Sequence, residues 1–205
     1  MSTRWMRPVF VFVSLVLATT TMSKIGFADS PFVVETVTLS PEEDGQFGAI
    51  ALDAFGNPSL SYCDWYSTDE LRYARRAGGT WSTEVVPNTM YTGWTSLALT
   101  GAGEPRISYT YNDATWHRLQ YAKRSGGVWS ISSVPGEGGI GSSLALSGDG
   151  SPRVSYIGFD EALTYSKWSG AQWLTEVVDD SLGVWSYRTS LALDSLDNPH
   201  ICYFD

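Results

Sequence analysis

A short pattern that alternates leucine with small residues occurs four times in the sequence. The copies are residues 49–53, 96–100, 143–147 and 190–194, which read AIALD, SLALT, SLALS and SLALD. Their central leucines, Leu52, Leu99, Leu146 and Leu193, follow one another at intervals of 47 residues. A fixed period of this length is typical of stacked-repeat proteins, in which each repeat is one supersecondary unit. The repeat therefore constrains the fold more than any single residue does.

Each repeat predicts four short strands. In the second repeat these strands are expected over residues 96–100, 106–111, 118–124 and 128–134. Ile107, Tyr109 and Tyr111 alternate with Ser108 and Thr110, which is the period of a half-buried strand. Aromatic and β-branched residues suit such a pleated surface.

The turns are as regular as the strands. Gly, Asn or Asp followed by Pro joins the first strand to the second at residues 56–58, 103–105, 150–152 and 197–199. Glycine-rich turns before Trp81, Trp129 and Trp173 join the third strand to the fourth, and these tryptophans are expected to pack between neighbouring sheets. Four-stranded units of about 40–50 residues build β-propellers. The prediction is an all-β chain, a β-propeller of about four blades starting near residues 49, 96, 143 and 190.

The amino terminus predicts export. Arg4 and Arg7 precede an apolar run over residues 9–18, and the small residues Gly26 and Ala28 mark a cleavage site after Ala28. The run is about half of the ~20 residues that span a bilayer, so we expect no membrane insertion after signal cleavage. Residues 1–28 are predicted to be a signal peptide and 29–205 the propeller, in a secreted, periplasmic or cell-surface protein.

Both ends of the propeller region are unusual. Residues 32–37 (FVVETV) match residues 81–86 (WSTEVV), so 32–39 are expected to form a strand that completes a closing blade. The fourth repeat has only its first two strands, and a missing third strand leaves an unpaired edge. We therefore expect a truncated array, the alternative being a small four-bladed ring with one reduced blade.

Charge and cysteines restrict the partners and the redox chemistry. Removal of Arg4, Arg7 and Lys24 leaves 10 of the 13 basic residues against 22 acidic ones, a net charge of −12. Such a surface argues against nucleic acid and anionic membranes as partners. Cys63 and Cys202 fall on second strands of the first and fourth repeats, so two buried thiols are expected, unless the array closes and brings these repeats together.

The up-and-down strand order places the longer loops at one end of the molecule. These loops hold most of the aromatic residues that the repeat does not fix, and binding residues commonly lie on loops of a rigid scaffold. The predicted ligand-binding residues are Tyr91, Trp94, Trp116, His117, Trp185 and Arg188. Flat rings beside polar groups suit a sugar, which stacks on the ring. The alternative is that the rings fill gaps between blades.

The sequence favours neither a metal nor a cofactor. Asp53, Asp149, Asp194 and Asp197 lie in turns, which acidic residues favour, and they lack the ordered ligand run of a calcium loop. His117 and His200 have no partner at zinc-ligand spacing.

Catalysis has little support in the sequence. A glycoside hydrolase needs paired carboxylates, for which the loop acids are candidates: Asp64, Asp69, Asp113, Asp160 and Glu161. Such acids are common in an acidic chain, and the sequence holds no nucleophile elbow, phosphate loop or metalloprotease helix.

The blade sequence resembles two known groups. Residues 106–109 (RISY), 119–121 (LQY), 126–129 (GGVW) and 141–145 (GSSLA) look like one blade of the fucose-binding propeller lectins of fungi and bacteria, and of exported bacterial propellers. The resemblance implies that an Arg opening the second strand and a Glu on the third strand contact the sugar, with an aromatic residue nearby. Arg106 and Arg153 match the Arg, whereas Ser59 and His200 replace it in the other repeats. The Glu position holds tyrosine in three repeats: Tyr73, Tyr121 and Tyr165.

The glycine–tryptophan turn is also similar to the Asp-box of sialidases, although Arg76 and Arg124 stand where that box has its Asp. We expect a non-catalytic protein that binds a glycan or an extracellular protein through its long-loop face. A sialidase-like glycoside hydrolase, or a scaffold segment of a larger surface protein, are the alternatives.

Overall fold

A computed structural model describes residues 35–37, 44–64, 69–112, 117–136, 138–181 and 188–204. All regular structure in these residues is β, and all but one of the strand pairings are antiparallel, so the all-β prediction is confirmed. None of the described residues forms a helix long and apolar enough to cross a membrane. The predicted signal peptide, 1–28, lies outside the described residues. Of the segment 32–39, only 35–37 are described, and they are not in a strand.

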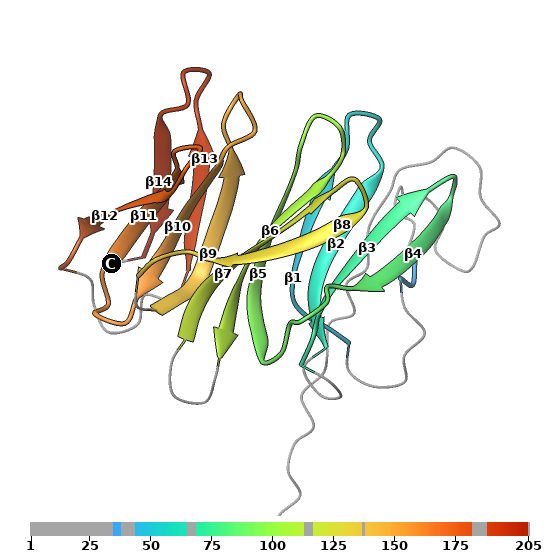
Figure 1. The fold of residues 1–205 in the computed structure, drawn as a ribbon, viewed down its shortest axis with the longest axis horizontal. Coiled ribbons are helices and arrows are strands. Elements are labelled where there is room, and N and C mark those ends of the chain that lie inside the picture. The colour runs from blue at the N-terminus through green and yellow to red at the C-terminus, as the bar shows by residue number, and fades with distance from the viewer. Residues whose placement is uncertain are drawn as a thin grey trace, which may run out of the picture.

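The strands form four successive units, shown side by side in Figure 1. Unit 1 holds β1 (Asp44–Leu52), β2 (Pro58–Asp64), β3 (Leu71–Ala77) and β4 (Thr80–Val85). Unit 2 holds β5 (Thr92–Leu99), β6 (Pro105–Asn112), β7 (His117–Ser125) and β8 (Val128–Ser133). Unit 3 holds β9 (Gly138–Leu146), β10 (Pro152–Gly158), β11 (Leu163–Trp168) and β12 (Trp173–Asp179). Unit 4 holds β13 (Thr189–Leu193) and β14 (Pro199–Tyr203). Each unit is an antiparallel meander, and one parallel bridge, between Arg118 and Gly138, joins units 2 and 3.

The first strand of a unit begins earlier than the leucine motif suggests. β5 starts at Thr92, and its pairing with β6 slips between Gly93 and Ser96, where Trp94 has a φ of 38°. Phe47 and Gly141, at the equivalent positions of β1 and β9, have φ angles of 54° and 61°. A bulge interrupts the alternation of inward and outward side chains, so a prediction from periodicity misses the part of the strand that precedes the bulge.

The hydrophobic core lies between the units. Leu97 of β5 packs with Leu71 and Tyr73 of unit 1 and with Tyr109 of its own unit. Leu144 of β9 takes the same place between units 2 and 3. The leucine motif is therefore the innermost part of each interface, where burial of apolar side chains is the main source of stability.

The repeated tryptophans also join the units, as the sequence predicted. Trp129 meets Tyr73 of unit 1 edge-on, with 5.8 Å between ring centroids, and Trp173 meets Tyr121 of unit 2 at 5.5 Å. Edge-to-face contact is a favoured aromatic geometry. Trp81 of unit 1 instead donates its Nε1–H to Glu35, at 2.9 Å.

A pair of hydrogen-bonded hydroxyls recurs at each of the three interfaces between the described units. Thr95 pairs with Ser61 at 2.8 Å, Ser142 pairs with Ser108 at 2.9 Å, and Thr189 pairs with Ser155 at 2.8 Å. In addition, the amides of Leu144 and Leu191 donate to Ser96 Oγ at 3.0 Å and Ser143 Oγ at 2.9 Å. Buried polar groups need such partners, so these bonds fix how one unit sits on the next.

The two cysteines differ, and the prediction of two buried thiols is wrong for one of them. Both are free; Cys63 is buried and Cys202 is exposed. Burial raises the pKa of the Cys63 thiol to about 12. Cys202 occupies the position of Ser61, Ser108 and Ser155, which the following unit covers, and no described unit follows unit 4.

Removal of one hydroxyl from an interface should destabilise the protein. Ser108→Ala leaves Ser142 without its partner, which costs about 1–3 kcal/mol. The double variant Ser108→Ala/Ser142→Ala should lose less than the sum of the single variants, and Ser195→Ala in an exposed turn should change little. Urea denaturation measures all four. Additive losses would show that the two hydroxyls do not interact.

Candidate functional site

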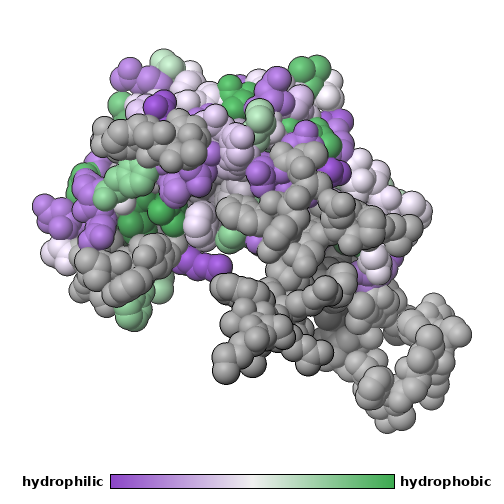
Figure 2. Space-filling model, turned by 90° about the horizontal axis from the view of Figure 1, so that it is seen from below, coloured by the Kyte–Doolittle hydropathy of each residue, from purple (hydrophilic) through white to green (hydrophobic). Residues whose placement is uncertain are grey.

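The hollows of the molecule lie at two ends. The turns between first and second strands lie at the upper edge of Figure 1. By the meander order, the turns between third and fourth strands belong to the same end of each unit. The longer loops lie at the opposite end, which Figure 2 views from below and where hydrophobic and hydrophilic residues are interspersed. We call these the tight-turn end and the long-loop end.

Two grooves between units open at the tight-turn end. The 3–4 groove, of about 540 Å³, is lined by unit 3 and by the first turn of unit 4; its residues include Arg153, Tyr165, Lys167, Trp168, Glu176, Asp197 and Asn198. The 2–3 groove, of about 250 Å³, lies between units 2 and 3; its residues include Arg106, Tyr121, Lys123, Trp168 and Trp173.

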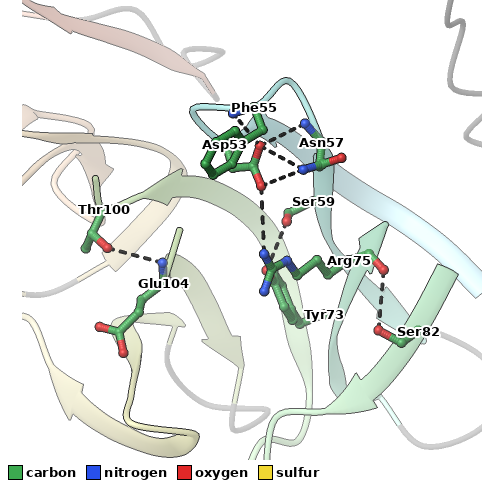
Figure 3. Close-up of polar contacts among 9 residues, drawn as sticks. All are labelled: Asp53, Phe55, Asn57, Ser59, Tyr73, Arg75, Ser82, Thr100 and Glu104. Carbon is green, nitrogen blue, oxygen red and sulfur yellow. Dashed lines mark hydrogen bonds and ion pairs between the residues drawn. The ribbon is translucent and has the colours of Figure 1, made fainter. Parts of the chain in front are cut away.

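The two grooves are built from equivalent positions. Each receives an arginine from the start of a second strand and a tyrosine and a lysine from a third strand. The sets are Arg106, Tyr121 and Lys123 in unit 2 and Arg153, Tyr165 and Lys167 in unit 3. Unit 1 has Ser59, Tyr73 and Arg75 at these positions, which Figure 3 shows.

In unit 1 these polar groups bind one another. Ser59 Oγ and Tyr73 Oη form a hydrogen bond of 2.9 Å. Arg75 Nη2 lies 3.8 Å from Asp53 Oδ2. The Asn57 side chain and amide donate to Asp53 and lower the pKa of its carboxyl (Figure 3). The tight-turn end of unit 1 is thus internally satisfied.

In unit 2 the arginine is used by its own sheet. Arg106 Nη1 donates to the carbonyls of Arg124 at 2.6 Å and Pro105 at 3.0 Å, and its Nη2 pairs with Glu104 at 3.4 Å. The amide of Gly126 donates to Glu104 and is the main cause of the lowered pKa of that carboxyl. Burial raises the pKa of Tyr121 to about 12, so its phenol is neutral.

Unit 3 differs because its groove residues are not used by the fold. The side chains of Arg153, Tyr165, Lys167 and Glu176 make no hydrogen bond or ion pair with any residue that the structure describes. Tyr165 is only 4% exposed, and burial raises its pKa. Trp168 lies beside them, with its ring 5.7 Å from Trp173. The 3–4 groove therefore offers donors and an acceptor that no internal side-chain contact occupies, next to the indole ring of Trp168.

A further pocket, of about 500 Å³, lies at the long-loop end between units 2 and 3. His117, Arg118, Pro135, Gly136 and Phe159 are among its lining residues. The rings of His117 and Phe159 are 5.7 Å apart.

The start of β9 requires glycine. A Cβ on Gly139, whose φ is 123°, would lie 2.6 Å from the Cβ of Leu119, so β9 can pack against β7 only without a side chain at this position.

The structure places the predicted ligand-binding residues in different surroundings. His117 lines the long-loop pocket. Trp94 packs on Phe47, with 4.9 Å between ring centroids, as expected for a ring that fills a gap between units. Tyr91 and Arg188 are exposed. Trp116 and Trp185 lie outside the described residues.

Two of the acidic candidates for catalysis, Asp64 and Asp160, have structural roles. Asp64 is buried and pairs with Arg72 at 3.0 Å. Asp160 accepts the amide of Ala162 at 3.3 Å. Asp113 lies outside the described residues.

Asp194 accepts the amides of Leu196 and Asn198, and the Asn198 side chain helps to lower the pKa of Asp194 to about 2, as expected of a turn-forming residue. No group of three or more His, Cys, Asp or Glu in the described part of the chain is arranged to hold a metal ion.

Sequence reasoning missed the part that Lys167, Trp168 and Glu176 play in a groove. The tight-turn end was expected to hold only short turns, and the grooves arise between units rather than within one. The available signal was the recurrence of Arg, Tyr and Lys at fixed places in two repeats.

Several solved structures are similar to this chain. A protein of unknown function from Dyadobacter fermentans superposes with a TM-score of 0.62 and 10% identity, over 83% of this chain and 60% of that one. The lectin of the fungus Aleuria aurantia, a six-bladed β-propeller with a fucose recognition mode of its own, superposes with a TM-score of 0.55 and 16% identity, over 77% of this chain and 53% of that one. A fucose lectin from Kordia zhangzhouensis, in complex with methyl-fucoside, superposes with a TM-score of 0.46 and 14% identity, over 64% of this chain and 99% of that one.

No protein-family model and no curated protein matches the sequence. The two structures with TM-scores above 0.5 show that this chain has the fold of part of a β-propeller. The chain matches 60% of the length of the Dyadobacter fermentans protein and 53% of the length of the Aleuria aurantia lectin.

Proposed function

We propose that the protein binds a glycan in the 3–4 groove. The observation that carries this proposal is the unoccupied polar set of Arg153, Tyr165, Lys167 and Glu176, beside the ring of Trp168. In unit 1 the equivalent Ser59 and Tyr73 bind each other, and in unit 2 the equivalent Arg106 binds its own sheet. Buried polar groups are normally satisfied, so the buried and unpaired Arg153 Nε supports a ligand in the groove, which the exposed side chains of Lys167 and Glu176 can also reach.

The chemistry of the groove suits a sugar. A pyranose hydroxyl both donates and accepts, so it can bind the cations of Arg153 and Lys167, the carboxylate of Glu176 and the neutral phenol of Tyr165. The apolar face of the sugar ring can stack on Trp168. A volume of about 540 Å³ is typical of small-ligand pockets. The fucose lectins with the same fold support this choice of ligand class.

The long-loop end is a second candidate site, for a glycan or an extracellular protein. The pocket at His117 and Phe159 supports it, and the other residues proposed for this face are Tyr91, Trp94, Trp116, Trp185 and Arg188. The protein would act by binding without catalysis. A sialidase-like hydrolase is the alternative, and release of sugar from a bound glycan would favour it.

The protein is proposed to be exported, because residues 1–28 have the features of a signal peptide. Amino-terminal sequencing of the protein from its native source should begin at Asp29, and a start at Met1 would contradict export by cleavage.

Variants of the 3–4 groove should lose glycan binding. A glycan array identifies a ligand, and calorimetry then compares the variants. Arg153→Ala should weaken binding about tenfold or more, because a hydrogen bond to a charged group contributes about 1.5–3 kcal/mol. Tyr165→Phe, which keeps the ring, should weaken it about threefold to tenfold.

The chain supplies matched controls. Lys123→Ala in the 2–3 groove should leave affinity unchanged, whereas Lys167→Ala should lower it. Loss of binding in Phe159→Ala and His117→Ala, with Arg153→Ala unaffected, would move the site to the long-loop end. Failure to bind any glycan would contradict the proposed function.

A further inference from the structure

One position on the fourth strand carries a carboxylate in units 1 and 3 but not in unit 2. Three residues after the repeated tryptophan lie Glu84 in unit 1, Ser132 in unit 2 and Glu176 in unit 3. The strand register shows that these positions are equivalent, because each of the three residues pairs with the same tyrosine position of its third strand. In the segment before unit 1, Glu35 matches Glu84. Among the described four-stranded units, only unit 2 therefore lacks this carboxylate.

Two of these carboxylates bind donors of the unit that follows. Glu35 accepts hydrogen bonds from Arg76 Nη2 at 2.8 Å and from the indole N–H of Trp81 at 2.9 Å. Glu84 pairs with Arg124 Nε of unit 2 at 3.2 Å. A carboxylate from the preceding segment or unit thus compensates positive charge on the outer strands of units 1 and 2.

At the interface of units 2 and 3 a donor has no partner. Trp173 is equivalent to Trp81, and its Nε1 is buried without a hydrogen-bond partner in the described part of the chain. The side chain of Ser132 is shorter than that of a glutamate, and it does not make the bond that Glu35 makes to Trp81. An unpaired buried donor is costly, so this indole indicates a missing acceptor.

The indole of Trp129 is unpaired as well, but its surroundings differ. Its cross-strand neighbour, Arg124, already holds Glu84. The cross-strand neighbour of Trp173 is Trp168 rather than an arginine. The interface of units 2 and 3 therefore has neither the carboxylate nor the arginine that binds it, and the 2–3 groove opens there instead.

The free groups of the 2–3 groove are donors, and their charge is positive. Three lining side chains make no hydrogen bond or ion pair with any residue that the structure describes: Tyr121, Lys123 and Ser132. The carboxylate in the lining, Asp149, is already bonded within its own turn, to the Ser147 hydroxyl at 2.6 Å and the Ser151 amide at 2.9 Å. The groove is thus suited to an anion.

We propose that the 2–3 groove binds a uronic acid, a sugar that carries a carboxylate. This carboxylate accepts the indole N–H of Trp173, as Glu35 accepts that of Trp81, and it pairs with the ammonium of Lys123. The hydroxyls of Tyr121 and Ser132 bind those of the sugar, because a hydroxyl both donates and accepts. A volume of about 250 Å³ lies just below the range of about 300–1,000 Å³ that is typical of ligand pockets, so the occupant is a single sugar ring.

The 3–4 groove does not share this preference for an acid. Glu176 lines it at the position equivalent to Ser132, and a carboxylate repels a second anion. The 3–4 groove therefore suits a neutral glycan and the 2–3 groove an acidic sugar. The inference does not depend on the glycan proposed above.

Calorimetry with two matched sugars tests the proposal. Methyl β-D-glucuronide carries a carboxylate where methyl β-D-glucoside carries a hydroxymethyl group. The glucuronide should bind about tenfold more tightly or better, because hydrogen bonds to a charged group are stronger than those between neutral groups. Its affinity should fall as salt is added. Equal affinities for the two sugars, or no binding of the glucuronide, would overturn the proposal.

Two variants of the 2–3 groove test where the acid binds. Lys123→Ala should weaken glucuronide binding about tenfold through loss of the cation, and the exposed position of Lys123 leaves the fold intact. Ser132→Glu should abolish binding without lowering the melting temperature, because the chain then supplies the carboxylate itself. Unchanged glucuronide binding in both variants would contradict the proposal.

The 3–4 groove supplies the matched controls. Arg153→Ala and Lys167→Ala should leave glucuronide binding unchanged. Conversely, Lys123→Ala and Ser132→Glu should still bind the neutral glycan of the 3–4 groove, so failure of one proposal can be told from failure of the other. Loss of glucuronide binding in Lys167→Ala, with Lys123→Ala unaffected, would place the acid in the 3–4 groove and overturn the inference.

Discussion

The structure depends on how each unit is bonded to the next. Each interface between the described units has a bonded hydroxyl pair, such as Ser108 with Ser142. The interfaces of units 2 and 3 and of units 3 and 4 also have a backbone amide bonded to a serine. These bonds have direction, whereas the leucine and tyrosine packing around them is apolar and tolerates rotation. The angle between units is therefore set by the polar pairs. That angle defines the grooves, because each groove is lined by residues of two successive units.

Repetition of the scaffold does not imply repetition of the site. The three equivalent positions at the tight-turn end have diverged: Ser59 bonds to Tyr73, Arg106 bonds to its own sheet, and Arg153 has neither contact among the described residues. The fold needs one copy of the interface at each boundary but needs no particular residue in the groove. The 3–4 groove thus has polar side chains available for a ligand, whereas Ser59 and Arg106 stabilise their own units.

Much of the fold was predictable from the 47-residue period, because strands and turns depend on local pattern. The bulges were not, since Trp94 and Phe47 adopt left-handed backbone angles that alternation does not encode. The candidate site was less predictable still. Aromatic residues such as Trp94 were expected to bind a ligand, but that ring packs on Phe47, and the 3–4 groove depends on which side chains the fold leaves unused. Which side chains remain without a partner can be seen only in the structure, because Arg106 and Arg153 occupy equivalent positions in the sequence.

Hydrogen exchange of two backbone amides tests the central claim most directly, namely that directed bonds between units hold the array rigid. The amides of Leu144 and Leu191 donate to serine side chains of another unit rather than to their own sheet. If the units are locked together, both amides exchange as slowly as the interior amides of β6 and β10, through global unfolding. Exchange as fast as that of amides in the exposed turns would show that the units move independently, and would contradict this account.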